Sequence, residues 1–506
     1  MTDSTRFLIV GNAEPFEHAA IPRLGFDDFR RAMIEGAAGG LRVGALFASP
    51  EGARELGIYG VLLDDLTAAV RVARSVVPVG PFASLTPECP QAHLFEREIA
   101  EQFGVEPLGH PWLKPVRFHA AYSGRSQPWV GGPAVIGVTD FYRVEGEEVH
   151  EVAVGPVHAG IIEPGHFRFQ CHGEEVFHLE ISLGYQHRGI ERRLAGGPDR
   201  RTIHYMETLA GDTTIGHTTA YCQAVEAMAG VHAPVRAQVI RGIALELERL
   251  ANHVGDLGAL AGDVGFLPTA AYCGRIRGDY LNMSAAICGN RFGRDLVRPG
   301  GVLFDVEPAA VEGLLARLDE AERDTASAVN LLWDSSSVMG RFEDTGRITR
   351  ETANEIGLVG PAARASGINR DVRNDFPAGI FQYSHVPIST WSTGDVFGRA
   401  YVRWLEVQLS IRFIREQLRA LPEGPVLAPC GGLPPGRCVV SLVEGWRGEI
   451  CHVAMTGPDG RFSRYKVVDP SFHNWFGLAL ALRGQQISDF PLCNKSFNLS
   501  YSGHDL

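Results

Sequence analysis

The sequence predicts an α+β protein, with a small N-terminal α+β domain followed by a larger, mainly helical domain that carries small β-sheets. Three observations support this prediction. With 506 residues, the chain is longer than one ordinary hydrophobic core accommodates. A segment rich in Gly, Ser and Pro at 122–132 separates two regions of globular composition. Beyond it, long segments have apolar residues three or four positions apart, which indicates helices.

The N-terminal domain is expected to cover residues 1–125. It mixes short apolar runs with predicted helices at 27–36 and 66–75, and it ends in AHLFEREIAEQFGVEPLGHPWLKP at 92–115. A linker is expected at 126–148, because low apolar content with many Gly and Pro residues favours an extended chain over a packed core.

The second domain is expected to cover residues 149–506 and to open with a small sheet. Residues 166–185 alternate apolar and polar positions around a turn at 172–174, which is typical of a β-hairpin. Further strands are predicted within 444–469, joined by the Gly-containing turn at 457–460.

Three helices are predicted in the second domain. The first begins at Pro234, since proline is favoured in the first turn, and it continues with apolar residues at every third or fourth position. Segments 308–332 and 398–421 have similar spacing. Asp395 precedes the last of these segments and is expected to cap that helix.

The composition of the chain excludes several classes of function. The chain is 45% hydrophobic and 21% charged, with no apolar run long enough to cross a bilayer. A net charge of −12 argues against nucleic acid as a partner. The first ten residues lack the pattern of a secretory signal, so we expect a cytoplasmic protein. Nine cysteines without a CxxC pair indicate reduced thiols, neither a disulfide framework nor an iron–sulfur cluster.

Several segments of the second domain resemble one known family. GPVHAGIIEPGHFRF at 155–169 is similar to the start of group 4 hydrogenase large subunits, and LGYQHRGIERR at 183–193 is close to the family pattern Y-x-H-R-G-x-E. VRAQVIRGIALELERLANHVGDLGALAGDVGF at 235–266 resembles the long family helix. NRFGRDLVRPGGV at 290–302 and GPAARASGINRDVR at 360–373 resemble complex I and group 4 sequences.

The N-terminal domain resembles a second family. FEREIAEQFGVEPLGHP at 95–111 is similar to the signature of the 30-kDa subunit of respiratory complex I. Together the motifs resemble a fused 30-kDa and 49-kDa chain, as in the formate-hydrogenlyase-type large subunits of nickel–iron hydrogenases. This resemblance implies a complex I 30-kDa-like domain followed by a hydrogenase large subunit or 49-kDa-like domain.

In such hydrogenases, two CxxC pairs hold nickel and iron, because soft thiolates suit these metals. The segments that match these pairs are 208–221 and 496–506. The four former ligand positions carry other residues, namely Ala210, Thr213, Ser500 and Gly503. None of them supplies a thiolate, so we expect no metal site here.

Complex I replaces this metal cavity with a quinone pocket, and the resemblance implies that a His and a Tyr meet the quinone head group. Here the Tyr position falls on Gly211, and the His position falls on Ile162 or Glu163. The usual quinone ligands are therefore absent as well, and a quinone stays open as a ligand.

Ionisable residues remain near the expected cavity. The candidate catalytic residues are Glu163, His166, His217 and Asp212. Glu163 stands where the family carries a proton-transfer carboxylate, and burial would raise the pKa of such a group. The alternatives are a Glu that caps or pairs within its loop and a His217 that is a hydrogen-bonded core residue. His253 has the same two interpretations.

Arg188 and His158 are the candidate cofactor-binding residues. Arg188 matches the family arginine beside the 4Fe-4S cluster of the partner small subunit, and His158 is expected near that cluster or the quinone cavity. The alternative for Arg188 is a surface ion pair with Glu191. An ion pair is also expected between Asp371 and its neighbour Arg373, as a structural feature.

Two functions remain open. The first is a subunit of a membrane-associated respiratory oxidoreductase complex related to NADH-quinone oxidoreductase and formate hydrogenlyase, which transfers electrons to an acceptor such as quinone and is coupled to proton movement. Its expected partners are an iron–sulfur small subunit, a ferredoxin-like subunit and membrane proton-translocating subunits, which hold it on the inner face of the cell membrane. The second is a redox-silent scaffold subunit of such a complex.

Overall fold

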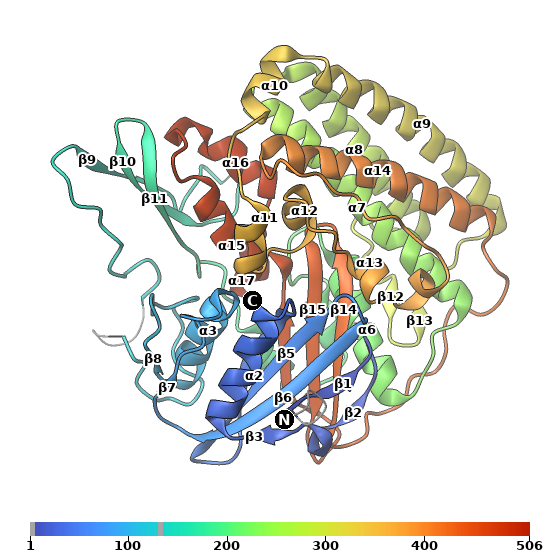
Figure 1. Ribbon diagram of the computed structural model, residues 1–506. Coiled ribbons are helices and arrows are strands. Elements are labelled where there is room, and N and C mark those ends of the chain that lie inside the picture. Colours follow the sequence, from blue (N-terminus) through green and yellow to red (C-terminus); the bar gives the residue numbers. More distant parts are fainter. Residues whose placement is uncertain (1–5, 130–134, 161) are drawn as a thin grey trace.

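The N-terminal part is a β-sheet covered by helices. The computed structural model describes residues 6–129, 135–160 and 162–506, so part of the predicted linker lies outside the described residues. The sheet has the order β1 (Leu8–Val10), β6 (Ala69–Pro78), β5 (Glu55–Asp64), β4 (Arg42–Pro50), with β3 (Arg23–Leu24) paired to β6. Helix α2 (Phe26–Ala38) packs on this sheet and confirms the helix predicted at 27–36 (Figure 1). Helix α3 (His93–Phe103) follows.

The helix predicted at 66–75 is wrong. Residues 65–68 form a turn, and strand β6 begins at Ala69 and pairs with β5 along its whole length. Strand β6 contains Val70, Val72, Val76 and Val77, and β-branched side chains favour a pleated strand over a helix.

The second part opens with a three-stranded antiparallel sheet of β9 (Val149–Val154), β10 (His166–His172) and β11 (Glu175–Ser182). Residues 166–172 pair with 175–182, which confirms the predicted hairpin. The sheet extends away from the helical body in Figure 1.

The helical body is built around α7 (Val235–Asp263), which packs against α8 (Leu267–Cys288) and α14 (Val396–Arg419), while α9 (Pro308–Trp333) packs on α8. The three predicted helices are confirmed as α7, α9 and α14, and Asp395 caps α14 by accepting a hydrogen bond from the Gly398 N–H at 2.7 Å. Helix α8 was not predicted, and α6 (Thr214–Ala229) packs mainly on strands β14 (Arg437–Gly445) and β15 (Gly448–Thr456).

A sheet in the centre of the molecule joins both parts of the chain. Its order is β16 (Phe462–Val468), β15 (Gly448–Thr456), β14 (Arg437–Gly445), β2 (Phe16–Glu17), and β2 comes from the N-terminal part. Buried residues of the N-terminal sheet and of β14 and β15 form one continuous core. The turn predicted at 457–460 lies between β15 and β16.

The chain ends in three helices that return to the centre, where the C-terminus lies close to α3 (Figure 1). They are α15 (Pro470–Ala481), α16 (Phe490–Phe497) and α17 (Tyr501–Asp505). The shorter elements of the described chain are β7 (Phe82–Ala83), β8 (Pro107–Leu108), α4 (Ile190–Leu194), α5 (Thr202–Met206), β12 (Val297–Arg298), β13 (Gly301–Val302), α10 (Ser336–Phe342), α11 (Arg350–Glu355), α12 (Gly360–Ala365) and α13 (Val372–Asp375).

Candidate functional site

Two short segments that are far apart in sequence meet around Arg447. Its Nη1 donates to the carbonyl of Gly211 at 2.8 Å and to Thr213 Oγ1 at 3.1 Å, and its Nε donates to the carbonyl of Asn498 at 2.6 Å. These acceptors belong to the loop before α6 and to the segment before α17, which contain the former ligand positions. The guanidinium therefore connects the two segments that contain the four positions where the sequence resemblance implies metal ligands.

The charge of Arg447 lies in a region that is closed to solvent. Its guanidinium stacks on the ring of Trp446 at 3.9 Å, and its side chain is buried. Burial lowers the pKa of Arg447, while the nearby carboxylates of Asp469, Asp256, Asp212 and Glu163 act in the opposite direction. The site is thus a buried cation surrounded by acidic groups.

Asp469 occupies the space beside Gly503. A Cβ atom at Gly503 would lie 2.6 Å from Cγ of Asp469, which is closer than any real contact. Burial opposes the ionised form of Asp469, but hydrogen bonding to His217 and the charge of Arg447 outweigh it, so the pKa of this carboxyl lies below its usual value.

The residues at this site do not fit a thiolate-held nickel–iron centre. Ala210, Thr213, Ser500 and Gly503 are all buried, and none carries the soft sulfur ligand that such metals require. Moreover, a side chain at 503 would collide with the Asp469 carboxyl group, and Arg447 places a positive charge between the two ligand segments.

His217 lies in a buried chain of four hydrogen-bonded side chains. Its Nε2 donates to Asp469 at 3.0 Å, its Nδ1 lies 3.1 Å from Nε2 of His452, and Nδ1 of His452 lies 2.9 Å from the hydroxyl of Tyr465. Burial and the neighbouring His217 hold the pKa of His452 well below its usual value, so this ring is neutral. His217 is therefore hydrogen-bonded within the core and also touches the site through Asp469.

Glu163 lies beside Gly211. Its Oε1 is 4.0 Å from the position that a Cβ at Gly211 would take, and its Oε2 accepts a hydrogen bond from the Tyr501 N–H at 3.3 Å. The carboxylate is only partly buried. The structure thus brings the predicted Glu163 next to Gly211, the position where the sequence resemblance implies a tyrosine.

Asp212 and the two predicted loop histidines have local partners. The Asp212 carboxylate pairs with Arg277 at 3.1 Å. His158 Nε2 bonds to the Gly165 carbonyl at 2.8 Å, and His166 Nδ1 lies 3.2 Å from the Gly155 carbonyl. The two histidine contacts hold the loop that carries Glu163.

Arg188 donates to the carbonyls of Thr208 and Leu209, at 2.8 Å and 3.0 Å. The alternative ion pair with Glu191 is wrong, because Glu191 is buried and pairs with Lys466 at 2.9 Å and with Arg464 at 2.9 Å. Arg188 therefore supports the segment just before Ala210.

Four residues of this site were not predicted from the sequence, namely Arg447, Asp469, His452 and Tyr465. Asp469 followed by Pro470 is a typical helix start, which gives a capping role and no sign of a site. Arg447 and His452 have partners more than 200 positions away, and Tyr465 joins the site only through His452 on the neighbouring strand, so no local pattern identifies these three residues.

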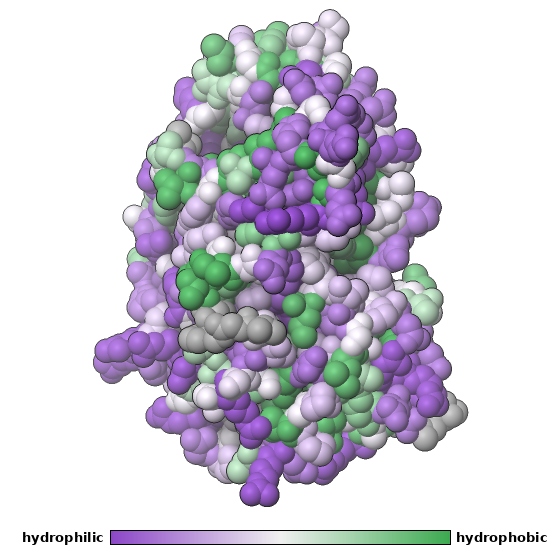
Figure 2. All heavy atoms as spheres, turned by 90° about the vertical axis from the view of Figure 1, so that its left-hand side faces the viewer, coloured by the Kyte–Doolittle hydropathy of each residue, from purple (hydrophilic) through white to green (hydrophobic). Residues whose placement is uncertain are grey.

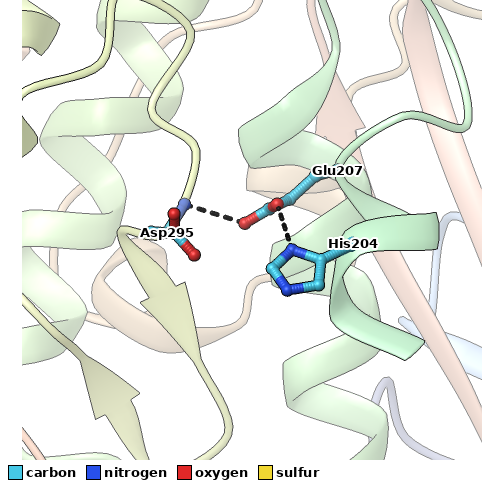
Figure 3. A group of neighbouring side chains, drawn as sticks. All are labelled: His204, Glu207 and Asp295. Atoms are coloured by element: carbon cyan, nitrogen blue, oxygen red, sulfur yellow. Dashed lines mark hydrogen bonds and ion pairs between the residues drawn. The ribbon is translucent and has the colours of Figure 1, made fainter. Parts of the chain in front are cut away.

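A second group of side chains resembles a metal site in its spacing. His204, Glu207 and Asp295 have ligand atoms within 4.8 Å of one another (Figure 3). However, Arg298 donates to Glu207 at 3.0 Å and also pairs with Asp295, so both carboxylates already have a cationic partner. We therefore interpret this group as an ion-pair cluster.

Known proteins match both parts of the chain. The 49-kDa subunit of respiratory-chain NADH dehydrogenase matches residues 263–433, and the 30-kDa subunit matches residues 49–129. The carbon monoxide-induced hydrogenase of Rhodospirillum rubrum is 32% identical over 69% of this chain and 97% of its own length. This chain belongs to the hydrogenase large subunit and complex I 49-kDa family. Its N-terminal part is a 30-kDa-type region, fused in the same chain to the 49-kDa-type region.

Other members of this family come from both of its branches. Formate hydrogenlyase subunit 5 of Escherichia coli is 30% identical over 84% of this chain and 77% of its own length. An NADH-quinone oxidoreductase subunit of Solibacter usitatus is 30% identical over 63% of this chain and 86% of its own length. Relatives in this family are thus subunits of oxidoreductase complexes. Within the described residues, no helix of this family member is long and apolar enough to span a bilayer.

Proposed function

We propose that this chain is the 49-kDa-type subunit of a membrane-associated respiratory oxidoreductase complex, in which it passes electrons from a partner iron–sulfur subunit to an acceptor and supports coupled proton movement. The observation that carries the proposal is the charged site at the former metal position, where Arg447, Asp469 and Glu163 lie near one another. Burying charges costs free energy, so a cavity without a function would be filled more stably by apolar side chains.

A quinone is the acceptor that fits this site best. Glycine at 211 leaves room where complex I carries a tyrosine. If a Cβ atom is placed at Gly211, Glu163 Oε1 is the described side-chain atom that lies within 4 Å of it. Reduction of a quinone consumes two protons, and a partly buried carboxylate beside the head group is a suitable proton donor when it is protonated. Glu163 is therefore proposed as this donor.

Exposed apolar residues around the β9–β11 sheet favour a partner subunit on this face. Figure 2 shows apolar groups among polar ones on the side of the molecule that carries the sheet. The exposed residues here include Val138, Tyr142, Val157, Ile162 and Phe177. We assign the iron–sulfur small subunit to this face, with Arg188 near its 4Fe-4S cluster, and the ferredoxin-like and membrane subunits to the same complex.

A second function is favoured by one observation. Arg447 and Asp469 occupy the space between the former ligand positions. Arg447 is hydrogen-bonded and Asp469 fills the space beside Gly503, so the site needs no bound ligand to neutralise its charges or to fill it. A redox-silent scaffold that holds the partner subunits together would need no more than this.

The test separates the two functions. The purified complex is titrated with quinone analogues while the redox state of the partner's iron–sulfur cluster is followed by electron paramagnetic resonance. The proposal expects the cluster to be oxidised by quinone, at least tenfold more slowly in Glu163→Gln than in the exposed control Glu174→Gln. A cluster that no quinone oxidises, in a complex that assembles normally, would establish the scaffold function.

A further inference from the structure

A network of charged side chains is buried where α7, α12, α13, α14 and β14 meet, in the middle of Figure 1. Each member is at most 5% exposed. The members are Glu246, Arg249, His253, Arg364, Asp371, Arg373, Glu406 and Glu444. The predicted ion pair of Asp371 with Arg373 is confirmed, at 2.6 Å, and is one link of this network.

The charges of this network do not balance. Four carboxylates face three guanidinium groups, and arginine stays protonated at all ordinary pH values. A buried excess of one negative charge is unfavourable, so the network holds one additional proton.

His253 does not carry this proton as a cation. Its Nε2 lies 2.8 Å from Glu406, while its Nδ1 is buried without a partner among the described residues. A protonated ring would leave an N–H donor unsatisfied at Nδ1, whereas the neutral ring leaves only an acceptor there. Burial also lowers the pKa of His253.

The four carboxylates differ in the number of donors that they accept. Glu246 accepts from Arg249, Arg373 and Ser410, and Glu406 accepts from Arg249, Arg364 and His253. Asp371 accepts two side-chain bonds and one backbone bond from Arg373. Such bonds stabilise the ionised form, and the pKa of each of these three carboxyls stays below its usual value although burial opposes this.

Glu444 has the weakest set of donors. Its Oε1 accepts from Arg364 at 2.7 Å, and within the described part of the chain its Oε2 accepts only from the Val372 N–H, at 3.1 Å. Burial and the charge of Asp371 raise the pKa of Glu444 to about 7, against the opposing effects of Arg364, Arg249 and Arg373.

Glu444 is also a wall residue of a cavity of 820 Å³ between α6, α7 and the loop before α14. The other titratable or charged residues that line this cavity are Glu226, His232, Arg241, Arg373 and Tyr383. Thr219 lies on the same wall, and its buried hydroxyl has no hydrogen-bond partner among the described residues. A cavity of this size with polar walls accommodates water, which would satisfy that hydroxyl.

We propose that Glu444 is a proton-exchange site, whose carboxylate takes a proton from hydronium in the water of this cavity and thereby neutralises the excess charge of the buried network. The proton leaves hydronium, the new bond is O–H on Glu444, and water is the product that returns to the cavity. No electron transfer is involved, so this inference does not depend on the function proposed above for the site around Arg447.

The test is infrared spectroscopy of the purified full chain as a function of pH, which detects the C=O stretch of a protonated carboxyl group. Buried Glu101 and Glu248, whose pKa values are raised to about 7 and about 8, also contribute to this band, so Glu444 is followed in the difference between wild type and variant. We expect the band that fades as the pH rises through about 7 to lose the contribution of one carboxyl group in Glu444→Gln and to keep its wild-type intensity in the exposed control Glu312→Gln. Folding of each variant is checked by circular dichroism. An unchanged band in folded Glu444→Gln would overturn the proposal.

A second variant, Asp371→Asn, tests the charge count and also serves if Glu444→Gln does not fold. Asp371→Asn removes one negative charge, so three carboxylates face three guanidinium groups and no additional proton is required. We expect the band of this variant at pH 7 to fall to the level found in Glu444→Gln, where Glu101 and Glu248 still contribute. A band of wild-type intensity in folded Asp371→Asn would contradict the charge count.

Discussion

Asp469 has three neighbours that depend on its charge. It accepts from His217 at 3.0 Å and from the Ser471 N–H at 2.8 Å, and it lies close enough to Arg447 to influence its pKa. A single carboxylate therefore connects the former metal position, the histidine chain and the start of α15.

Replacing Asp469 by Ala leaves Arg447 as a buried cation with less compensation. We expect Asp469→Ala to lower the free energy of unfolding by about 3–5 kcal/mol, as when one partner of a buried pair is removed. Chemical denaturation measures this loss. The exposed Asp334→Ala should change stability by less than about 0.5 kcal/mol, and a similar value for Asp469 would show that its charge is not needed.

Glu248 makes stability depend on pH. Burial raises its pKa to about 8, although it accepts from the Ile215 and Gly216 N–H groups. In the unfolded chain a Glu titrates near ~4.3. The folded form thus binds the proton more tightly, so its stabilising contribution is complete below the unfolded pKa and is lost as the pH rises towards 8.

The unfolding free energy of wild type should fall between pH 5 and 8 as Glu248 loses its proton. We expect Glu248→Gln to reduce this fall by on the order of 4 kcal/mol, from the size of the pKa shift. Denaturant titrations at several pH values measure the slope. The exposed Glu312→Gln serves as the control, and a slope equal to that of wild type in the Glu248 variant would refute the assignment.

Helices α7 and α8 pack closely through small residues. A Cβ at Gly258 of α7 would lie 2.6 Å from Cβ of Cys273 in α8, whereas a Cβ at Gly274 of α8 meets no described atom within 4 Å. The same substitution should therefore have opposite effects at these two positions.

We expect Gly258→Ala to destabilise the protein by about 1–3 kcal/mol through overpacking. Gly274→Ala should stabilise it by about 0.5–1 kcal/mol, because alanine restricts the unfolded chain and favours a helix. Thermal unfolding of both variants checks the pair, and equal effects would mean that the helices do not approach this closely.

The same helices show how far the sequence predicts the fold. Apolar residues at helical spacing identify α7, α9 and α14. Helix α8 buries Thr269, Cys273, Ile276, Tyr280 and Met283 at the same spacing, but Thr, Cys and Tyr are weak markers of an apolar face, so this helix was missed. The sequence of strand β6 wrongly suggests a helix, because short apolar runs fit either period. The candidate Glu163 is found through its motif, whereas Arg447 depends on contacts across the chain.

At the scale of the whole molecule, the two parts are joined by buried ion pairs. Lys466 of β16 pairs with Glu98 of α3 at 2.6 Å and with Glu191 at 2.9 Å, while Arg117 also pairs with Glu98. Together with strand β2 beside β14 and the shared core, these contacts tie the 30-kDa-like region to the 49-kDa-like region.

We expect the chain to unfold in one calorimetric transition, since the core of the N-terminal part is continuous with buried residues of the second part. Lys466→Ala should lower the unfolding free energy by about 3–5 kcal/mol and keep one transition, because it leaves Glu98 and Glu191 poorly compensated. Two separate transitions in the wild-type chain would show that the parts fold independently.

The contact between Gly503 and Asp469 also bears on whether a thiolate metal site could be engineered into this chain. Cysteines introduced at positions 210, 213, 500 and 503 would leave the Asp469 carboxyl group in contact with the side chain at 503 and the Arg447 guanidinium between the two pairs. Such a site would also require changes at Arg447, in the turn after β14, and at Asp469, at the start of α15. A single substitution is therefore not expected to create a thiolate-held metal site in this chain, because the neighbouring side chains would have to change with it.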